Sequence, residues 1–299
     1  MLSVGMRISV WFALAVVLGA CSKMGAQPDS DAFGLGKKLA EMKGDDLEEA
    51  SGLAMSQVNA GYLWTHNDSF NDPDIFLVDK DLKIRLKCRL AGVSNRDWED
   101  IAVGPGPEEG KSYIYLGEIG DNLAQYQVKI IYRFEEPVLT DGVKKLTITK
   151  FDTIAFQLPD GKKDTETLML NPVSKNLYVV SKREEPVHVY ELKYPYSVHD
   201  TLTAKDIATL PMKMTVAGDF STDGKEILVK NYKNIYYWRN DSNRPVAELL
   251  KEKPMILLYD EEPQGEAITW DNDGSGFYTL SEKKRGKKSF LFFYPRKTE

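Results

Sequence analysis

The sequence repeats one short pattern, a glutamate followed by small and apolar residues, as Glu49-Ala50-Ser51-Gly52-Leu53, Glu99-Asp100-Ile101-Ala102, Glu166-Thr167-Leu168-Met169 and Glu266-Ala267-Ile268-Thr269. A fifth, degenerate copy is Gly218-Asp219-Phe220, and the intervals between copies are 50, 67, 53 and 47 residues. A repeat of about fifty residues that begins with a short strand is typical of propeller blades. We therefore expect the innermost strands to place five acidic side chains around one axis: Glu49, Glu99, Glu166, Asp219 and Glu266.

The repeats predict an all-β protein, a single β-propeller of four-stranded blades. Second strands such as Tyr113–Leu116 and Leu177–Val180 are apolar on both faces, as expected where blades pack face to face. Five blades are favoured and six are the alternative, because the 67-residue interval holds an insertion but not two blades. The fifth blade lacks an outer strand, which Gly36–Met42 would supply, closing the ring. We also expect an outer strand of blade two within Leu146–Leu158 and a helix in Val246–Lys253.

The N-terminal residues have the pattern of an export signal. The apolar run Ile8–Leu18 is too short to cross a bilayer and fits a signal peptide. The sequence Leu18-Gly19-Ala20-Cys21 resembles the lipobox of bacterial lipoproteins, which implies lipidation of Cys21 and a membrane anchor. Ordinary secretion with cleavage near Ala20 is the alternative. We expect residues 1–20 to be the signal, 21–33 a lipidated tether and 34–299 the propeller. The expected location is the cell envelope, with the outer membrane favoured, facing the periplasm or cell surface.

Composition narrows the partners of the chain. The formal net charge is −6 and the basic stretches are short, so nothing favours nucleic acid. Cys88 is the one cysteine besides Cys21, so no internal disulfide forms once Cys21 is lipidated. We expect a monomer that contacts a membrane through Cys21.

The predicted second strands end in polar residues, at the rim where the inner-strand glutamates begin. Carboxylates gathered there would repel one another unless a cation offsets them, and Ca²⁺ takes 6–8 oxygen ligands. The alternative is an ion-paired network in which Lys182, Arg183 and Lys230 offset the acids. The candidate metal ligands are Glu49, Glu99, Glu118, Asp121, Glu166, Asp219 and Glu266.

Three stretches, Thr65–Ser69, Asn95–Ala102 and Tyr115–Asn122, together resemble the secreted propellers grouped as phytase-like, "esterase-like activity of phytase" and SdiA-regulated proteins. The resemblance implies a Ca²⁺-laden acidic centre that hydrolyses a phosphoester or related ester. It also implies ligand roles for Glu99, Glu118, Asp121 and Glu166, and phosphate contacts from Lys182 and Lys230.

His66 precedes Asn67 and Asp68, so it is a candidate general base; a structural hydrogen-bonding role is the alternative. The candidate catalytic residues are then His66 and Glu99. The candidate ligand-binding residues are Asn67, Asp68, Lys182, Arg183 and Lys230.

Two other functions stay open beside the hydrolase. The first is a non-catalytic module that binds a ligand or protein partner through rim loops at Phe70–Asp74 and Leu123–Gln127. The second is a ring whose acidic centre is purely structural.

Overall fold

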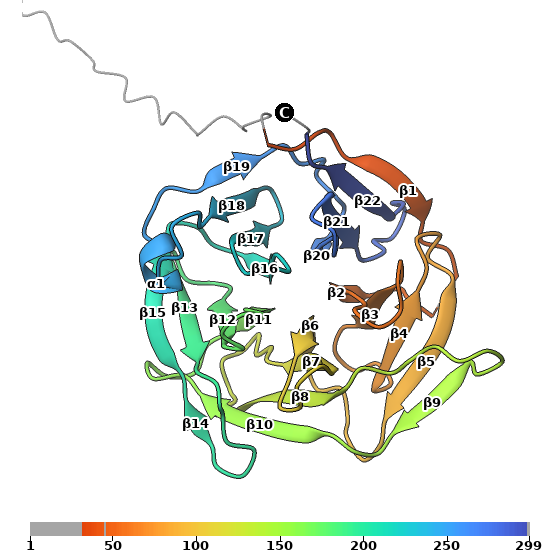
Figure 1. The fold of residues 1–299 in the computed structure, drawn as a ribbon, viewed down its shortest axis with the longest axis horizontal. Coiled ribbons are helices and arrows are strands. Elements are labelled where there is room, and N and C mark those ends of the chain that lie inside the picture. Colours follow the sequence, from red (N-terminus) through yellow and green to blue (C-terminus); the bar gives the residue numbers. More distant parts are fainter. Residues whose placement is uncertain (1–31, 45, 298–299) are drawn as a thin grey trace, which may run out of the picture.

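Five β-sheets surround one axis in the computed structural model, which describes residues 32–44 and 46–297 (Figure 1). The one helix in these residues is the short α1 (Val246–Leu249), inside the predicted helical segment. The predicted all-β, five-bladed propeller is confirmed. In the described part of the chain, no helix is long and apolar enough to span a bilayer. Cys21 and the predicted signal lie outside the described residues.

In each blade, successive strands run from the axis outward. Blade one consists of β2 (Ala50–Met55), β3 (Leu63–Asn67), β4 (Asp74–Val78), β5 (Ile84–Leu90) and β9 (Lys145–Ile148). Blade two consists of β6 (Trp98–Pro105), β7 (Ser112–Glu118), β8 (Lys129–Glu135), β10 (Asp152–Gln157) and β14 (Leu202–Thr203). Blade three consists of β11 (Thr165–Leu170), β12 (Leu177–Ser181), β13 (Val187–Leu192) and β15 (Lys205–Leu210). Blade four consists of β16 (Thr215–Phe220), β17 (Glu226–Asn231), β18 (Ile235–Arg239) and β19 (Met255–Leu257).

Blade five closes the ring by combining the two ends of the chain. It contains β20 (Gly265–Trp270), β21 (Gly276–Ser281), β22 (Phe290–Pro295) and, outermost, β1 (Lys37–Glu41). Strand β1 pairs antiparallel with β22, as predicted for Gly36–Met42. The paired strands satisfy each other's backbone groups and leave blade five complete, so the ring has no open seam.

Blade two has its outer strand where it was predicted, within Leu146–Leu158, because β10 pairs antiparallel with β8. The chain just before β10 forms β9, which instead pairs in parallel with β5 of blade one. Only β10 joins blade two, and β14 adds a short parallel strand beyond it. The chain between β8 and β10 thus runs outside two blades, as Figure 1 shows. It covers the outer edge of β5, whose backbone groups would otherwise face solvent unpaired.

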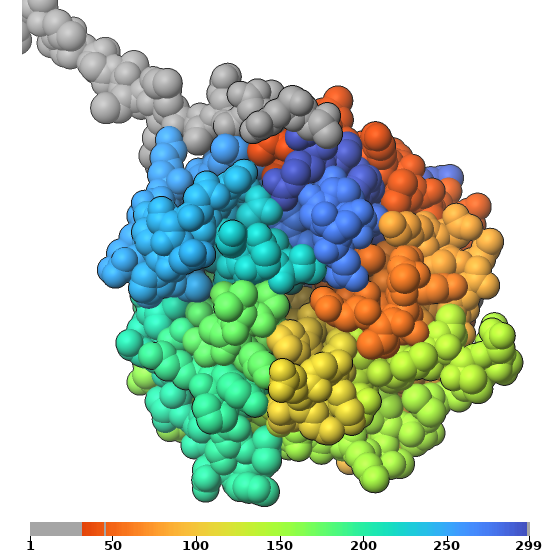
Figure 2. Space-filling view, viewed as in Figure 1, coloured from red at the N-terminus to blue at the C-terminus, as the bar shows by residue number. Residues whose placement is uncertain are grey.

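The hydrophobic core lies between the blades, because each central strand is buried on both faces. In β12, Leu177 and Val179 pack in a cluster shared with blade two, whereas Tyr178 and Val180 pack in one shared with blade four. Successive side chains of a strand point to opposite faces, so a strand between two seams must be apolar throughout. Each such side chain contributes roughly 1.5–3 kcal/mol when fully buried. Figure 2 shows the blades packed closely around the axis.

Candidate metal centre at the channel mouth

Every innermost strand carries an irregularity in its pairing just after its first residue. The register shift skips one residue in each strand: Ser51, Glu99, Glu166, Val216 and Glu266. These five positions are structurally equivalent, and three of them are glutamates. Bulges re-aim side chains, and they occur often beside functional sites. The end of the axis where these strands begin is called here the channel mouth.

Side chains from all five blades interact electrostatically at this mouth. Repulsion from Asp68 of blade one and Glu166 of blade three raises the pKa of Glu99 in blade two. Repulsion from Glu266 of blade five raises the pKa of Glu166 in the same way. Tyr232, which follows the second strand of blade four, donates a hydrogen bond to Glu266. The mouth is therefore built by residues that the repeats bring together from distant parts of the sequence.

Carboxylates gather there in two groups that share one member. In the first group, ligand atoms of Asp68, Asp97 and Glu99 lie within 4.8 Å of one another, and in the second those of Glu99, Asp164 and Glu166 do. Glu99 belongs to both. Carboxylate oxygens in this number and proximity are the ligands that a hard divalent cation prefers.

Glu99 is the most unusual side chain of the mouth. It is 4% exposed, and no hydrogen bond or ion pair reaches its carboxylate from any described residue. Burial raises its pKa well above the usual value, and the neighbouring Glu166, Asp68 and Asp97 add to that rise. Gly120 packs directly against the Glu99 and Asp97 carboxylates, leaving no room for a Cβ atom. The fold thus holds a buried carboxyl group without a partner at the centre of both groups.

The second group already has cationic partners. The Lys182 ammonium pairs with Glu166, and Arg183 Nε donates to Asp164 Oδ2 at 2.7 Å. The other oxygen of Asp164 accepts the Asp121 backbone N–H at 2.9 Å. Two donors therefore reach Asp164 and one reaches Glu166. Burial still raises the pKa of Glu166 well above its usual value, although Lys182 acts to lower it.

The first group has no such partner. In the described part of the chain, no ion pair reaches Asp68, Asp97 or Glu99. The Asp68 carboxylate accepts the backbone N–H of Ser69. Burial raises the pKa of Asp68 to about 6, and Asp97, Glu266 and Glu49 add to the rise. This group therefore lacks a cation in ion-pair contact, and Arg96 and Lys129 act on Asp97 only at longer range.

Besides these two groups, the mouth has an acidic pair on the blade-five side, Glu266 and Glu282. Burial raises the pKa of Glu282 to about 10, with Glu266 as the next cause. Gln264 donates to one Glu282 oxygen at 2.5 Å, while the other is buried without a partner. Glu266 accepts the Tyr232 hydroxyl. The raised pKa of Glu282 favours its neutral form beside Glu266.

Several predicted ring members lie elsewhere. Asp219 is the fifth residue of its strand, not the second, and contacts Thr269 and Trp270 at the far end of β20. Glu49 precedes its strand and is exposed, where it accepts from Asn71. The five-acid ring expected from the repeats is thus a ring of three glutamates, because blades one and four carry their acids at other registers.

Two further candidate ligands have structural partners. Glu118 accepts hydrogen bonds from Trp98 Nε1 at 3.3 Å and from the Tyr132 hydroxyl at 3.0 Å, inside blade two. Asp121 accepts the backbone N–H groups of Gln125 and Tyr126 at 2.6 and 2.8 Å, which fixes the loop between β7 and β8.

Among the candidate ligand-binding residues, Asp68, Lys182 and Arg183 reach the mouth, and Lys230 is buried beside it, where it interacts with Glu266. The Lys230 side chain is 0% exposed and lies between blades four and five, donating to the Gly265 carbonyl and to the Tyr259 hydroxyl. Asn67 holds the chain before β2, donating to the Asp46 carbonyl at 2.8 Å.

His66 is fully buried between blades one and two. Its Nδ1 lies 3.0 Å from the Asn67 carbonyl oxygen, and the Trp98 ring packs edge-on at 6.1 Å. Burial lowers the pKa of His66 to about 4, so the ring is neutral, and Nε2 has no partner. This environment favours the structural role over general-base chemistry; the catalytic role stays a prediction.

Sequence reasoning missed Asp97 and Asp164, which complete the two carboxylate groups. Both residues lie directly before an inner strand, two positions ahead of Glu99 and Glu166. The repeated Asp-x-Glu pattern was the signal that identifies them. The pattern also occurs at Asp46–Glu48 and Asp260–Glu262, so only its place directly before an inner strand marks the two carboxylate pairs.

The two rim loops next to the first group expose apolar side chains. Phe70, in the loop after β3, is 93% exposed, and its N–H donates to the Asn95 carbonyl. Leu123 and Tyr126, in the loop after β7, are 76% and 41% exposed. The Arg96 guanidinium lies 4.0 Å from the centroid of the Tyr126 ring. The acidic mouth therefore has an apolar border on blades one and two.

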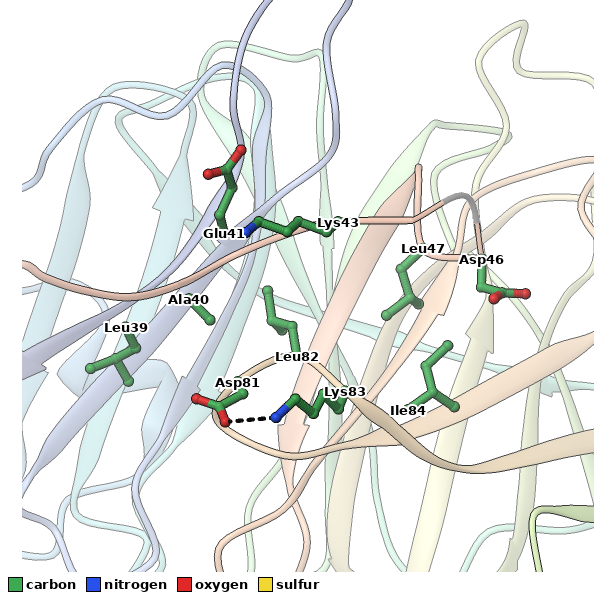
Figure 3. A pocket seen from close by; sticks show the side chains of 10 residues that line it. All are labelled: Leu39, Ala40, Glu41, Lys43, Asp46, Leu47, Asp81, Leu82, Lys83 and Ile84. Carbon is green, nitrogen blue, oxygen red and sulfur yellow. Dashed lines mark hydrogen bonds and ion pairs between the residues drawn. The ribbon is translucent and has the colours of Figure 1, made fainter.

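A separate groove of about 620 Å³ lies where β1 closes the ring, beside the hairpin that joins β4 and β5 (Figure 3). Leu39, Leu47 and Ile84 line it together with charged side chains, including the ion-paired Asp81 and Lys83. None of the candidate site residues lines this groove.

Comparisons with known proteins add likenesses to solved structures only. No family model matches the chain, and no curated protein matches it. It is similar to the Dos1 propeller, with 13% identity, a TM-score of 0.40, and coverage of 84% of this chain and 60% of that one. It is also similar to hydrazine synthase of Kuenenia stuttgartiensis, with 11% identity, a TM-score of 0.44, and coverage of 85% and 97%. The fold and site define a five-bladed β-propeller with a carboxylate-lined mouth, and the resemblance to phytase-like propellers stays a prediction.

Proposed function

We propose that this protein is an envelope-anchored, Ca²⁺-binding propeller whose loaded mouth receives an anionic substrate, for which the family resemblance implies a phosphoester or related ester. The observation that carries the proposal is Glu99, a buried carboxyl group without a partner that is shared by two groups of three carboxylates. A buried charge is stable only when it is paired, so this position calls for a cation.

The residues present fit Ca²⁺ better than a softer metal. The donors of both groups are carboxylate oxygens, with no cysteine or histidine among them. Such donors suit Ca²⁺, which accepts irregular geometry and 6–8 oxygen ligands, whereas zinc prefers nitrogen and sulfur. Asp68, Asp97 and Glu99 are the first residues expected to hold the ion.

The basic side chains at the edge of the mouth suit an anionic ligand. Arg183 is 45% exposed and pairs with Asp164 of the second group, and Arg96 is 25% exposed and pairs with Glu118 of blade two. Guanidinium groups bind phosphate and carboxylate oxygens with two parallel hydrogen bonds. A bound Ca²⁺ would supply the positive charge that offsets the carboxylates and polarises a substrate oxygen. Arg96 and Arg183 would orient the substrate.

The course of the chain bears on how an anchored protein would present this mouth. The first described residues, near Phe33, bridge to Arg296 beside the end of β22 that pairs with Gly276. The mouth lies at the opposite end of β21, next to Ser281 and Glu282. The described chain therefore begins at the end of the propeller opposite the mouth.

Thermal unfolding with EDTA and with Ca²⁺ tests the proposal. A cation bound only by the folded state, at about a hundred times its Kd, adds roughly 2.7 kcal/mol to the free energy of unfolding. Ca²⁺ should raise the unfolding temperature and the same concentration of Mg²⁺ should raise it less. A screen of p-nitrophenyl phosphate and carboxylate esters, with and without Ca²⁺, then tests hydrolysis. An unchanged unfolding temperature in both salts would rule out the cation site.

The apolar border favours a second candidate function, non-catalytic binding of a protein partner. Phe70, Leu123 and Tyr126 expose large apolar surface beside a charged mouth, as interaction sites often do. If this function holds, replacing Phe70 and Leu123 by serine should abolish capture of the partner and leave the Ca²⁺-induced shift unchanged. Loss of ester hydrolysis in the same variant would instead favour a substrate-binding role for these loops.

A further inference from the structure

The two carboxylate groups of the mouth are unequal in charge, and Lys182 causes the difference. The Lys182 ammonium is 8% exposed by side chain and pairs with Glu166, a member of the second group. It also interacts favourably with Glu99 and Glu266, and lies 5.7 Å from the centroid of the Tyr232 ring. A cation fixed to the chain thus already occupies the second group.

The first group has no cation in ion-pair contact, and Arg96 and Lys129 act on its member Asp97 only at longer range. Within the described residues, no lysine or arginine pairs with Asp68, Asp97 or Glu99. Arg183 is committed to Asp164 and Asn122, both on the side of the second group. The shared member, Glu99, is buried, has no hydrogen-bond or ion-pair partner among the described residues, and faces both groups.

We propose that Lys182 acts as a built-in cation that limits the mouth to one divalent ion, bound by Asp68, Asp97 and Glu99. The inference rests on the proposed function, because it assumes that the mouth binds Ca²⁺. The Lys182 ammonium and a second Ca²⁺ would compete for the same carboxylate oxygens. Because both are positively charged, they would also repel each other within one group. Removing the ammonium frees Glu166 and Asp164, so that the second group becomes a site of the same oxygen chemistry as the first.

Calcium titration of the full chain by isothermal calorimetry tests the inference. The wild-type protein should bind one Ca²⁺, and Lys182→Met should bind two. Lys233→Met is the matched control, because Lys233 is an exposed lysine on the same rim and its removal should leave the stoichiometry at one. Two ions in the wild-type protein, or one ion in Lys182→Met, would overturn the role of Lys182 while leaving the cation site intact.

A second variant protects the test from loss of the fold. Lys182→Met leaves Glu166 buried without a partner in EDTA, whereas Lys182→Gln keeps a neutral donor for it. The glutamine variant should remain folded in EDTA and also bind two ions. Absence of Ca²⁺ binding in the wild-type protein and both variants would instead reject the proposed function itself. A wild-type protein that binds none and variants that bind one would mean that Lys182 closes the whole mouth, which contradicts the inference.

Discussion

The Asp219 carboxylate of blade four accepts the backbone N–H of Trp270 in blade five, with 2.9 Å between Oδ2 and the nitrogen. Asp100 of blade two accepts the Leu168 N–H of blade three in the same way, also at 2.9 Å. Both carboxyl groups are buried among inner strands. Carboxyl groups therefore connect neighbouring blades by accepting backbone donors, a structural role distinct from the cation-binding role proposed at the mouth.

Asp219 gives a prediction for the pH dependence of stability. Burial raises its pKa from 3.8 to about 7, so between those values the folded protein holds a proton that the unfolded chain releases. Its contribution to stability is therefore present at low pH and lost as the pH rises towards 7. Asp219→Asn mimics the protonated form, so its free energy of unfolding should fall less than that of the wild-type protein from pH 4 to 7. One pKa unit corresponds to about 1.4 kcal/mol, so the difference should be at most about 4 kcal/mol.

Urea unfolding at successive pH values, followed by tryptophan fluorescence, measures this difference. Asp241→Asn is the control, because Asp241 lies at an exposed turn and pairs only with Arg239. Other buried carboxyl groups of the wild-type protein titrate in the same direction, so the difference between the two curves is the quantity of interest. Parallel curves for wild type and Asp219→Asn would show that Asp219 stays ionised in the fold.

The repeats predicted the blades because their cause is simple. A strand between two packed seams must be apolar on both faces, and β7 and β12 show this in their sequences. The closing strand was predictable for a related reason, since the fifth blade ends one strand short. In contrast, β9 pairs with blade one across an interval that no local pattern marks. Its place depends on which sheet edge remains free, a property of the assembled ring.

The candidate site was predicted only in part, because the repeats were aligned on their acids rather than on their bulges. Glu99, Glu166 and Glu266 occupy equivalent positions, and those three were found. Asp219 matched the repeated glutamates by residue type alone, and its side chain lies near the other end of its strand, where it contacts Trp270. Asp97 and Asp164 precede the strands and become neighbours of Glu99 only through the contact between blades two and three.

Replacing Glu99 tests the centre of the proposed cation site. Glu99→Gln removes the one carboxylate common to both groups, so the Ca²⁺-induced rise in unfolding temperature should disappear. In EDTA the variant should be at least as stable as the wild-type protein, because a buried acid crowded by other acids is gone. Differential scanning calorimetry measures both effects. If the hydrolase proposal holds, ester hydrolysis is lost as well.

Glu49→Gln is the control for that experiment, because Glu49 is exposed and lies outside both carboxylate groups. It should keep the Ca²⁺ response. A Glu99→Gln protein that still responds to Ca²⁺ would place the ion elsewhere. A variant that fails to fold would show that the Glu99 carboxyl supports the ring directly.

Gly120 gives a steric test of the same centre. A Cβ atom at this position would collide with the Glu99 and Asp97 carboxylates. Gly120→Ala should therefore displace both ligands, lowering stability by about 1–3 kcal/mol and weakening the Ca²⁺ response. Gly104→Ala is the comparison, since its Cβ would press only on the flexible end of Leu170. Gly104→Ala should lower stability and leave the Ca²⁺ response intact. If Gly120→Ala also keeps the full Ca²⁺ response, Glu99 and Asp97 are not ligands of the ion.

Lys230 and Glu262 give a test of how the seam between blades four and five is held. Lys230 Nζ lies 3.7 Å from Glu262 Oε2, and both side chains are almost completely buried. Glu262 also accepts the Tyr259 hydroxyl at 2.7 Å and the Thr279 hydroxyl at 3.0 Å. Burial lowers the pKa of Lys230 to about 8, so removing water from the ammonium costs more than its partners return.

Such a pair is costly to break but not to replace. Lys230→Met alone leaves the Glu262 carboxylate buried without its cation and should destabilise the protein by about 3–5 kcal/mol. The double variant with Glu262→Gln should lose less than the sum of the single variants, because neither partner is left charged and alone. Urea unfolding of the four proteins at pH 7 measures the coupling. Additive losses would mean that Lys230 acts through its hydrogen bond to the Gly265 carbonyl, and that this backbone contact, not the ion pair, joins the two blades.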